Sequence, residues 1–232
     1  MKKLFFYTIT IITLLTVADC KRNKKENNPI EPQMILNINP KEKVEISLKG
    51  SGNATIDWGD GKIDNITLID DSLNTIPHYT HQYSNKFTRT ITITGGKIRV
   101  LFCPDIQLKQ LDIKENTVME ELWCYNNQLA NLDVSKSVAL KGLYCYNNKL
   151  TTLNVNKNTA LEWLNCVDNN FSETALNELF ETLCIYKNTS TFGGYIEVFE
   201  NKGADGCNKN IAEKKGWCVI STAYPPIEPI IL

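Results

Sequence analysis

A cysteine recurs every 21 residues through the middle of this chain, and that constant period restricts the folds open to it. Each cysteine ends the same three-residue frame, which starts with leucine: Leu101-Phe-Cys103, Leu122-Trp-Cys124, Leu143-Tyr-Cys145 and Leu164-Asn-Cys166. Another apolar residue follows five positions later, at Leu108, Leu129, Leu150 and Phe171. A period of about 20 to 29 residues with this apolar pattern predicts a solenoid, in which each repeat packs only on its neighbours. Solenoids commonly serve as binding surfaces, so the pattern favours binding over catalysis.

The repeat unit matches the leucine-rich-repeat pattern L-x-x-L-x-L-x-x-N-x-L, with cysteine in the third leucine position. Leucine and cysteine two residues apart point to one face of a strand, so both are expected in the core. An asparagine stands three residues after the last three of these cysteines, at Asn127, Asn148 and Asn169, and can bond free backbone groups where the chain turns. A second polar row falls in register at the next turn, at Asn116, Ser137 and Asn158.

The repeated cysteines are interpreted as a buried packing ladder, because free cysteine is among the most buried residue types. Metal binding and disulfides between neighbouring repeats are the alternatives, and the chain has no C-x-x-C pair. Of the other cysteines, Cys207 and Cys218 flank a predicted short helix, where a disulfide is plausible but the sequence does not fix the pairing.

After Asn170 the repeat pattern gives way to other elements. Helical apolar spacing predicts a helix over 172–183, starting at Ser172 or Glu173. Residues 195–201 fit a fifth repeat, with Ile196, Val198 and Asn201 in the leucine, cysteine and asparagine positions. A short helix over 211–216 and a last strand over 217–220 are expected to close the core.

Residues 34–97 alternate apolar and polar residues in short runs, which predicts an antiparallel β-sandwich. Glycine clusters at 50–52, 59–61 and 95–96 separate the runs. The segment Asp57-Trp58-Gly59-Asp60-Gly61, followed by His81-Gln-Tyr83, resembles the PKD-like domains of surface proteins. That resemblance implies a tight turn with a buried tryptophan and aspartates of mainly structural role.

Metal binding in this region is the alternative. Asp57, Asp60 and Asp64 could hold calcium, although no full loop of spaced oxygen ligands is present. His78 and His81 are three positions apart, so on a strand they face opposite ways and suit a shared metal poorly.

The N-terminus combines a basic start, Met1-Lys-Lys3, with an apolar run from Leu4 to Val17 that is too short to span a membrane with its flanks. The run leads to Cys20 and resembles a bacterial lipoprotein signal, which implies a signal peptide over 1–19 and lipidation of Cys20. An ordinary secreted protein or a plain membrane anchor is the alternative. The polar segment 20–33 is expected to be a flexible tether.

Composition and motifs exclude several functions. The formal net charge of −1, from 25 basic and 26 acidic residues, gives no nucleic-acid signature. No nucleophile elbow, zinc-protease motif or phosphate loop occurs, and no carboxylate pair stands out as acid and base. We therefore expect a protein that is not an enzyme, with no cofactor and no metal.

Together, the signal, the W-G-D-G segment and the L-x-C-x-x-N-x-L repeats resemble the internalin-like leucine-rich-repeat surface lipoproteins of Bacteroidetes-type bacteria. The resemblance implies a mainly β chain with short helices, in which an antiparallel sandwich (34–97) precedes a parallel-sheet solenoid with a C-terminal cap (98–220) and a Pro-containing tail (221–232). It also implies an outer membrane lipoprotein, and the basic residues after Cys20 leave open which membrane face it occupies. Asp71-Ser72-Leu73 matches the short acceptor pattern that such bacteria O-glycosylate.

A candidate binding site follows from the strand alternation. Residues flanking each cysteine point outward, to the concave face, and in the middle repeats they form an exposed aromatic patch. The candidate ligand-binding residues are Trp123, Tyr125, Tyr144, Tyr146, Phe102, Glu121 and Asn165. Such a patch predicts adhesion or binding of a host or bacterial surface protein. A glycan-binding accessory lipoprotein of a nutrient-uptake system is the alternative, and a purely structural aromatic ladder remains open.

Overall fold

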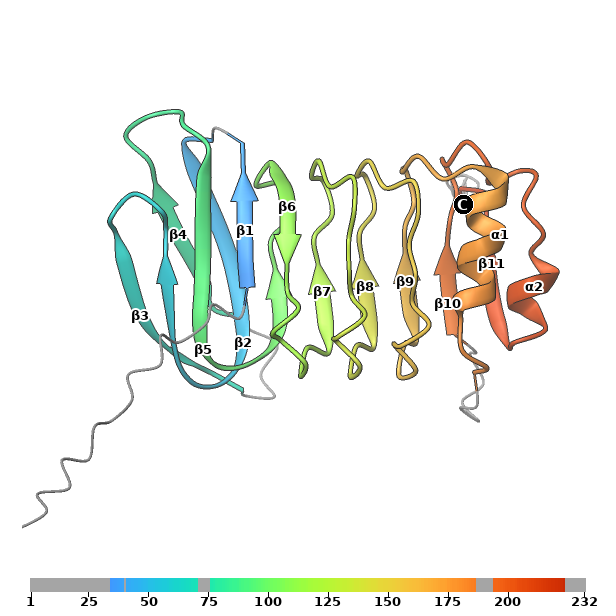
Figure 1. The fold of residues 1–232 in the computed structure, drawn as a ribbon, viewed down its shortest axis with the longest axis horizontal. Helices are drawn as coiled ribbons and strands as arrows, with labels where there is room; N and C mark the ends of the chain where they lie inside the picture. The colour runs from blue at the N-terminus through green and yellow to red at the C-terminus, as the bar shows by residue number, and fades with distance from the viewer. Residues whose placement is uncertain (1–33, 40, 71–75, 187–193, 224–232) are drawn as a thin grey trace, which may run out of the picture.

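The computed structural model describes residues 34–39, 41–70, 76–186 and 194–223. These residues form a mainly β structure with two short helices, and their eleven strands belong to one mixed sheet (Figure 1). The predicted signal peptide, the lipidation site Cys20, the tether and the pattern Asp71-Ser72-Leu73 lie outside the described residues. Residues 224–232 of the predicted tail lie outside them as well.

The repeats form a row of short parallel strands (Figure 1). The row runs from β5 (Arg89–Phe102) through β7 (Glu121–Trp123), β8 (Gly142–Tyr144), β9 (Trp163–Asn165), β10 (Gly194–Glu197) and β11 (Trp217–Ile220). Equivalent positions pair in register, in the series Leu101, Leu122, Leu143, Leu164 and Ile196. Because neighbouring strands lie about 4.8 Å apart, each repeat position becomes a column of side chains across the sheet.

The N-terminal strands pair antiparallel. Strand β1 (Met34–Ile38) lies between β5 and β6 (Leu108–Asp112). The long strand β2 (Lys43–Asp57) pairs with β3 (Ile63–Leu68), with β4 (His78–Gln82) and with β5. Since β5 belongs to both the antiparallel and the parallel parts, it joins them in one sheet. The predicted boundary between residues 97 and 98 falls inside this strand.

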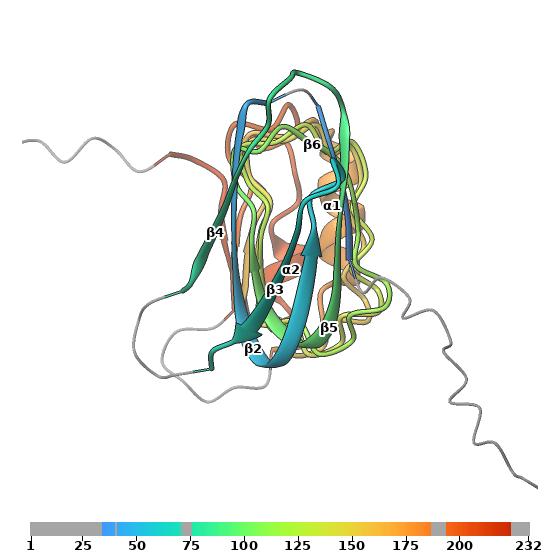
Figure 2. The ribbon, with the colours of Figure 1, turned by 90° about the vertical axis from the view of Figure 1, so that its left-hand side faces the viewer.

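Two glycine clusters were expected to separate strands, and that expectation is wrong. Strand β2 continues through 50–52 and β5 through 95–96, with register shifts between them at these glycines. A Cβ on Gly50 would lie 2.0 Å from the Lys97 carbonyl oxygen, so glycine permits a close backbone approach at a bulge. On either side of these glycines β2 and β5 stay paired with each other, but the second partner of each strand changes, from β4 to β3 for β2 and from β1 to β7 for β5. Figure 2 shows the chain bending from one layer to the other there.

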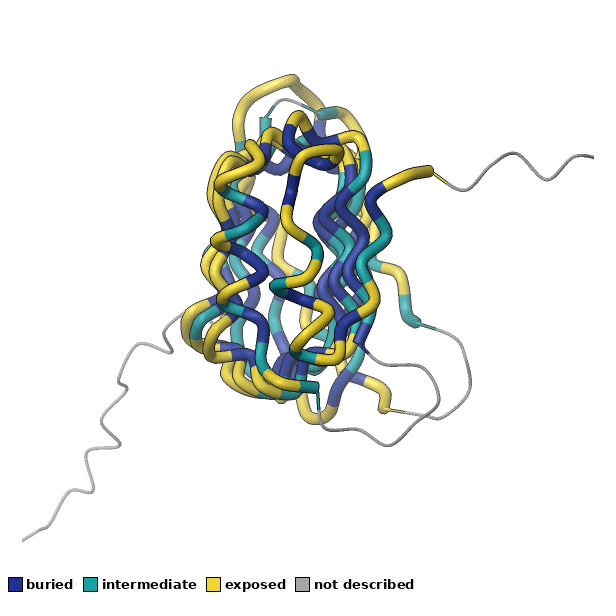
Figure 3. Tube along the Cα trace, turned by 90° about the vertical axis from the view of Figure 1, so that its right-hand side faces the viewer, coloured by how far each residue is buried: buried dark blue, intermediate teal, exposed yellow. Residues whose placement is uncertain are grey.

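One continuous hydrophobic core runs from the antiparallel strands to the end of the parallel row. All four repeated cysteines and the leucines two residues before them are completely buried, which confirms the ladder predicted from the period. Figure 3 shows buried positions alternating with more exposed ones along the strands. The predicted helix is confirmed as α1 (Glu173–Thr182), capped by the Ser172 hydroxyl, and it buries Leu176, Leu179 and Phe180.

The C-terminal elements close the row of strands. The fifth repeat is confirmed, because β10 pairs with β9 and places Ile196 and Val198 in the core. The short helix α2 (Asn210–Glu213) ends three residues before Gly216, where the backbone takes a left-handed turn at φ +84°. Strand β11 then pairs with β10, and buried Trp217 covers the end of the core.

Candidate functional site

The cysteine ladder serves packing. Burial raises the pKa of Cys103 and of Cys145 to about 12, so these thiols remain protonated at neutral pH. All seven cysteines in the described part of the chain are free, including Cys207 and Cys218. The part of the chain that the structure describes contains no cluster of three or more His, Cys, Asp or Glu side chains that could hold a metal ion.

An asparagine ladder fixes the turn that follows each strand. The side-chain amide of Asn148 donates to the carbonyls of Cys124 and Cys145 at 3.0 and 3.1 Å, and its oxygen accepts from the Leu129 N–H at 2.9 Å. The same pattern occurs at three further asparagines, Asn127, Asn169 and Asn201. The predicted role of this asparagine is confirmed. It satisfies backbone groups that burial would otherwise leave unpaired.

The residue two positions after each cysteine position takes a left-handed backbone conformation. This row, here called the rim, has φ between 49° and 60° and consists of Asp105, Asn126, Asn147, Asp168 and Glu200. Asparagine and aspartate adopt such angles more readily than most residues. Every rim residue is exposed, and the Asn147 amide donates to Asn126 Oδ1 at 2.9 Å. The rim is therefore a polar row at one end of the strands.

Three columns of side chains point away from the core, because residues alternate along each strand. The columns consist of the residues three positions before, one position before and one position after the cysteine position of each repeat. We call these fifteen residues the outward face: Val100, Glu121, Gly142, Trp163, Tyr195, Phe102, Trp123, Tyr144, Asn165, Glu197, Pro104, Tyr125, Tyr146, Val167 and Phe199. Eight of the fifteen are aromatic, so the face is mainly an aromatic surface.

The aromatic side chains stack from repeat to repeat. The rings of Trp123 and Tyr144 are 3.5 Å apart and 12° from parallel, and those of Tyr125 and Tyr146 are 4.4 Å apart and 8° from parallel. Phe102 meets both Trp123 and Tyr125, with ring centres 5.9 and 5.8 Å away. The structure therefore brings the predicted aromatic residues together. They are half-buried rather than exposed, because each ring covers its neighbour.

The polar residues predicted for the site have neighbours on the same face. Trp123 donates from Nε1 to Glu121 Oε2 at 2.9 Å, and Asn165 donates from Nδ2 to Glu197 Oε2 at 2.8 Å. The first bond orients the indole ring. The second places a largely buried carboxylate beside the end of the aromatic columns.

Sequence reasoning did not assign Trp163 and Tyr195 to the site. Their rings stack 5.0 Å apart in the column three residues before the cysteine position. The alternation that identified the flanking residues could have found them, because this column lies on the same face two residues further back. In the same column Gly142 makes room for a ring: a Cβ there would lie 2.9 Å from Tyr144 Cε2.

The acid–base properties of the face follow from burial and negative charge. The pKa of Tyr144 is raised by burial and by the charges of Glu121 and Glu197. Burial, with a smaller contribution from Tyr125, raises the pKa of Tyr146 to about 12. Burial also raises the pKa of Glu197 above the ordinary glutamate value. Both tyrosine hydroxyls therefore stay protonated at neutral pH.

The tryptophan turn of the antiparallel part uses its aspartates for local bonds. Asp57 accepts from the Gly59 N–H at 2.9 Å and Asp64 accepts from Trp58 Nε1 at 2.7 Å. Asp60 accepts from the Lys62 N–H at 3.1 Å and lies 2.8 Å from His81 Nε2. These bonds are the turn role predicted for the aspartates, around a fully buried Trp58.

The two histidines have different surroundings. His81 stacks on the Trp58 ring at 5.0 Å. His78 instead lies 2.8 Å from the Ser47 hydroxyl and 3.4 Å from Glu45. The two imidazoles thus bond to separate groups.

No protein-family model matches the chain, and no curated protein matches it. Among solved structures, the chain is similar to one described as "Functional domain of InlJ from Listeria monocytogenes includes a cysteine ladder". The identity is 26% with a TM-score of 0.39, over 50% of this chain and 23% of that chain. Within the described ranges, no helix is long and apolar enough to cross a membrane.

Proposed function

We propose that this chain is a non-enzymatic cell-envelope lipoprotein that binds a protein partner through the outward face of its leucine-rich repeats. We also propose that the chain folds as an antiparallel sandwich that passes into a leucine-rich-repeat solenoid. The 21-residue register of the parallel strands and the asparagine ladder support the solenoid. The change of the second pairing partner at the glycines of β2 and of β5 supports the sandwich.

The observation that carries the function is the aromatic stacking on the outward face. A ring that stacks on the next repeat turns its flat sides along the row of strands. Sugars bind aromatic residues on those flat sides, whereas a protein can pack against the ring edges and the tyrosine hydroxyls. At 3.5 Å, the Trp123–Tyr144 pair leaves no room for a sugar between its rings. Tyrosine and tryptophan are also the residues enriched in protein interfaces.

Glycan binding is the second candidate, and the rim favours it. The exposed amides of Asn126 and Asn147 stand one residue beyond Tyr125 and Tyr146. Amides next to aromatic rings are a common way to hold sugar hydroxyls. A glycan would then lie along the rim, in contact with ring edges.

Attachment to the outer membrane is proposed through a lipid on Cys20. The support is the basic start, the short apolar run and the cysteine at its end. Growth with an alkyne-tagged fatty acid should label the wild-type protein and leave Cys20→Ser unlabelled. Equal labelling of both would remove the anchor from the proposal.

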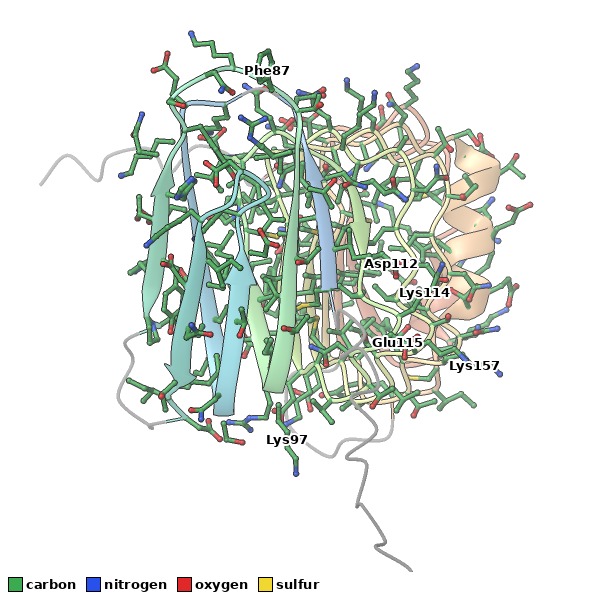
Figure 4. The ribbon with its side chains drawn as sticks, turned by 60° about the vertical axis from the view of Figure 1, so that its left-hand side comes forward. Phe87, Lys97, Asp112, Lys114, Glu115 and Lys157 are labelled. Atoms are coloured by element: carbon green, nitrogen blue, oxygen red, sulfur yellow. The ribbon has the colours of Figure 1, made fainter. Side chains whose placement is uncertain are left out.

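The binding proposal is tested by comparing three proteins on the same samples. The wild type, Trp123→Ala/Tyr144→Ala and Phe87→Ala are each offered to cell-surface protein extracts and to a glycan array. Phe87 is a matched aromatic control, because it is 65% exposed on a loop of the antiparallel part (Figure 4). We expect the double variant to lose a protein that the other two retain, and that protein is then titrated in pure form.

A glycan signal lost only in the double variant would favour the second candidate. Retention of the same proteins by all three would place binding away from the outward face.

A further inference from the structure

Strand β3 is a free edge of the sheet. Among the described residues it pairs with β2 and with no other strand. The chain stays bonded to the β2 segment beyond both ends of the strand: the Trp58 N–H donates to the Lys62 carbonyl at 3.0 Å, and the Gly50 N–H donates to the Ile69 carbonyl at 3.3 Å. A strand in this position presents unpaired backbone N–H and C=O groups to any further strand.

Exposed apolar side chains stand at both ends of this edge. Ile63 is 52% exposed and Ile69 is 48% exposed. Lysine and proline, which commonly keep edge strands from pairing, do not occur between positions 63 and 69. The one charged residue in that stretch is Asp64, which accepts from Trp58 Nε1 of its own chain at 2.7 Å. By contrast, the exposed residues of β4, which also pairs only with β2, are polar: His78, Thr80 and Gln82.

The segment from Lys62 to Asp70 is complementary to a second copy of itself. In an antiparallel pair with a two-fold axis at Ile66, residues equally far from the axis lie opposite each other. Such pairs stabilise a sheet when they are both apolar, of opposite charge or hydrogen-bonded. This register gives one pair of each kind: Ile63 with Ile69, Lys62 with Asp70, and Asn65 with Thr67.

The asparagine–threonine pair repeats contacts that already occur within the chain. Thr67 donates to Asn53 Oδ1 and Thr55 donates to Asn65 Oδ1, each at 3.1 Å across β2 and β3. Within the described structure, the side-chain amide of Asn65 donates no hydrogen bond. It can therefore donate to the Thr67 hydroxyl of a second copy.

Other registers of the same pair fit less well. An axis between two residues would place outward side chains opposite inward ones. An axis at Thr67 places Asp64 opposite Asp70, and like charges directly opposite are destabilising. An axis at Asn65 places Ile63 opposite Thr67. The sequence of the edge thus selects the axis at Ile66.

We propose that a second copy of this chain pairs with β3 edge to edge and forms a two-fold symmetric dimer. The pairing satisfies backbone groups of both edges and removes the exposed isoleucines from water. Its one unlike pair is Asp64 opposite Leu68, and both are turned toward their own chain, since Asp64 bonds Trp58 and Leu68 is buried. The dimer does not depend on the proposed function. Figure 1 shows β3 at the end of the molecule opposite β11, so the outward faces of both copies stay free.

Sedimentation velocity of the purified full-length protein in detergent micelles tests the dimer. The wild type is compared with Ile63→Lys/Ile69→Lys, which places lysines opposite each other across the axis. Val118→Lys/Val138→Lys is the matched control, because it adds the same charges at two exposed valines on turns of the repeats. We expect a wild-type dimer whose dissociation constant rises at least about tenfold in the isoleucine variant and less than about twofold in the control. Thermal unfolding shows whether each variant is folded.

Cross-linking in cells identifies the partner and the register. A photoreactive phenylalanine analogue is placed at Asn65 or at Asn154, an exposed asparagine of the repeats, and adducts are identified by peptide mass spectrometry. We expect an adduct of two copies from position 65, joined near Thr67, and none from position 154. A monomeric wild type, equal dissociation constants in the two lysine variants, or no two-copy adduct from position 65 would overturn the proposal.

Discussion

Replacing Asn148 by alanine should destabilise the protein by about 3 kcal/mol, and the hydrogen bonds of this residue give the magnitude. Among the described residues the Leu129 N–H has the Asn148 side chain as its only acceptor, so the substitution leaves a buried donor unpaired. An unpaired buried group costs about 1–3 kcal/mol. The carbonyls of Cys124 and Cys145 each keep a second donor, at Asn127 or Asn169, so each loses about 0.5–1 kcal/mol.

Urea unfolding followed by circular dichroism measures the effect. With a slope of about 2 kcal/mol per molar urea, a loss of about 3 kcal/mol lowers the midpoint by about 1.5 M. The control is Asn147→Gly, which removes an exposed amide next in the chain and retains the left-handed backbone at φ 49°. Its stability should change by less than about 1 kcal/mol. A midpoint shift no larger than the control's, at unchanged slope, would refute the account of the asparagine ladder.

Three further predictions concern the outward face and the thiols. Burial raises the pKa of Glu197, so the folded state favours the protonated carboxyl. The stability that this preference contributes is fully present below the pKa of about 4.3 in the unfolded chain and is lost as pH rises through the pKa in the folded protein. Glu197→Gln should therefore raise the urea midpoint at pH 7 relative to the wild type, and a gain that persists unchanged at pH 3 would contradict this cause. Gly142→Ala should displace the Tyr144 ring and so weaken the near-ultraviolet circular dichroism of the stacked Trp123–Tyr144 pair. The free energy of unfolding should fall by less than about 1 kcal/mol. An unaltered spectrum would show that the ring accommodates the added methyl group without moving. In the native protein at pH 8, exposed Cys218 should react with a thiol reagent at least about tenfold faster than the ladder cysteines, measured by peptide mass spectrometry, and equal rates would mean that the ladder opens.

The periodic features of the fold could be predicted because each repeat position has one physical environment. Cysteine at a core position and leucine two residues before it recur in all four cysteine repeats, and asparagine at the turn recurs in the last three of them. The fifth repeat was recognisable although valine replaces cysteine at 198, since both are small apolar residues.

The glycine clusters could not be interpreted from sequence alone. A turn and a bulge both call for glycine, and the choice depends on how closely another strand approaches. At Gly50 the deciding contact is the carbonyl of Lys97, which lies 47 positions along the chain. Local sequence does not contain that contact.

Alternation along the strands identified part of the outward face, but not the contacts among its side chains. Alternation placed Trp123 and Tyr144 on one face, yet their exposure depends on rotamers that let one ring cover the other. The hydrogen bond between Asn165 and Glu197, which are 32 residues apart, likewise depends on side-chain rotamers and could not be predicted from the sequence. Which residues share a face is a matter of period, whereas the contacts among them are a matter of packing.

Site-directed photo-cross-linking tests the central claim most directly. A photoreactive phenylalanine analogue is placed at Tyr146 on the outward face or at exposed Lys157 (Figure 4), and each protein is irradiated in living cells that produce it. The account predicts a discrete protein adduct from position 146 and none from position 157. Adducts of equal yield from both positions, or an adduct from position 157 alone, would contradict the claim that the outward face binds a protein partner.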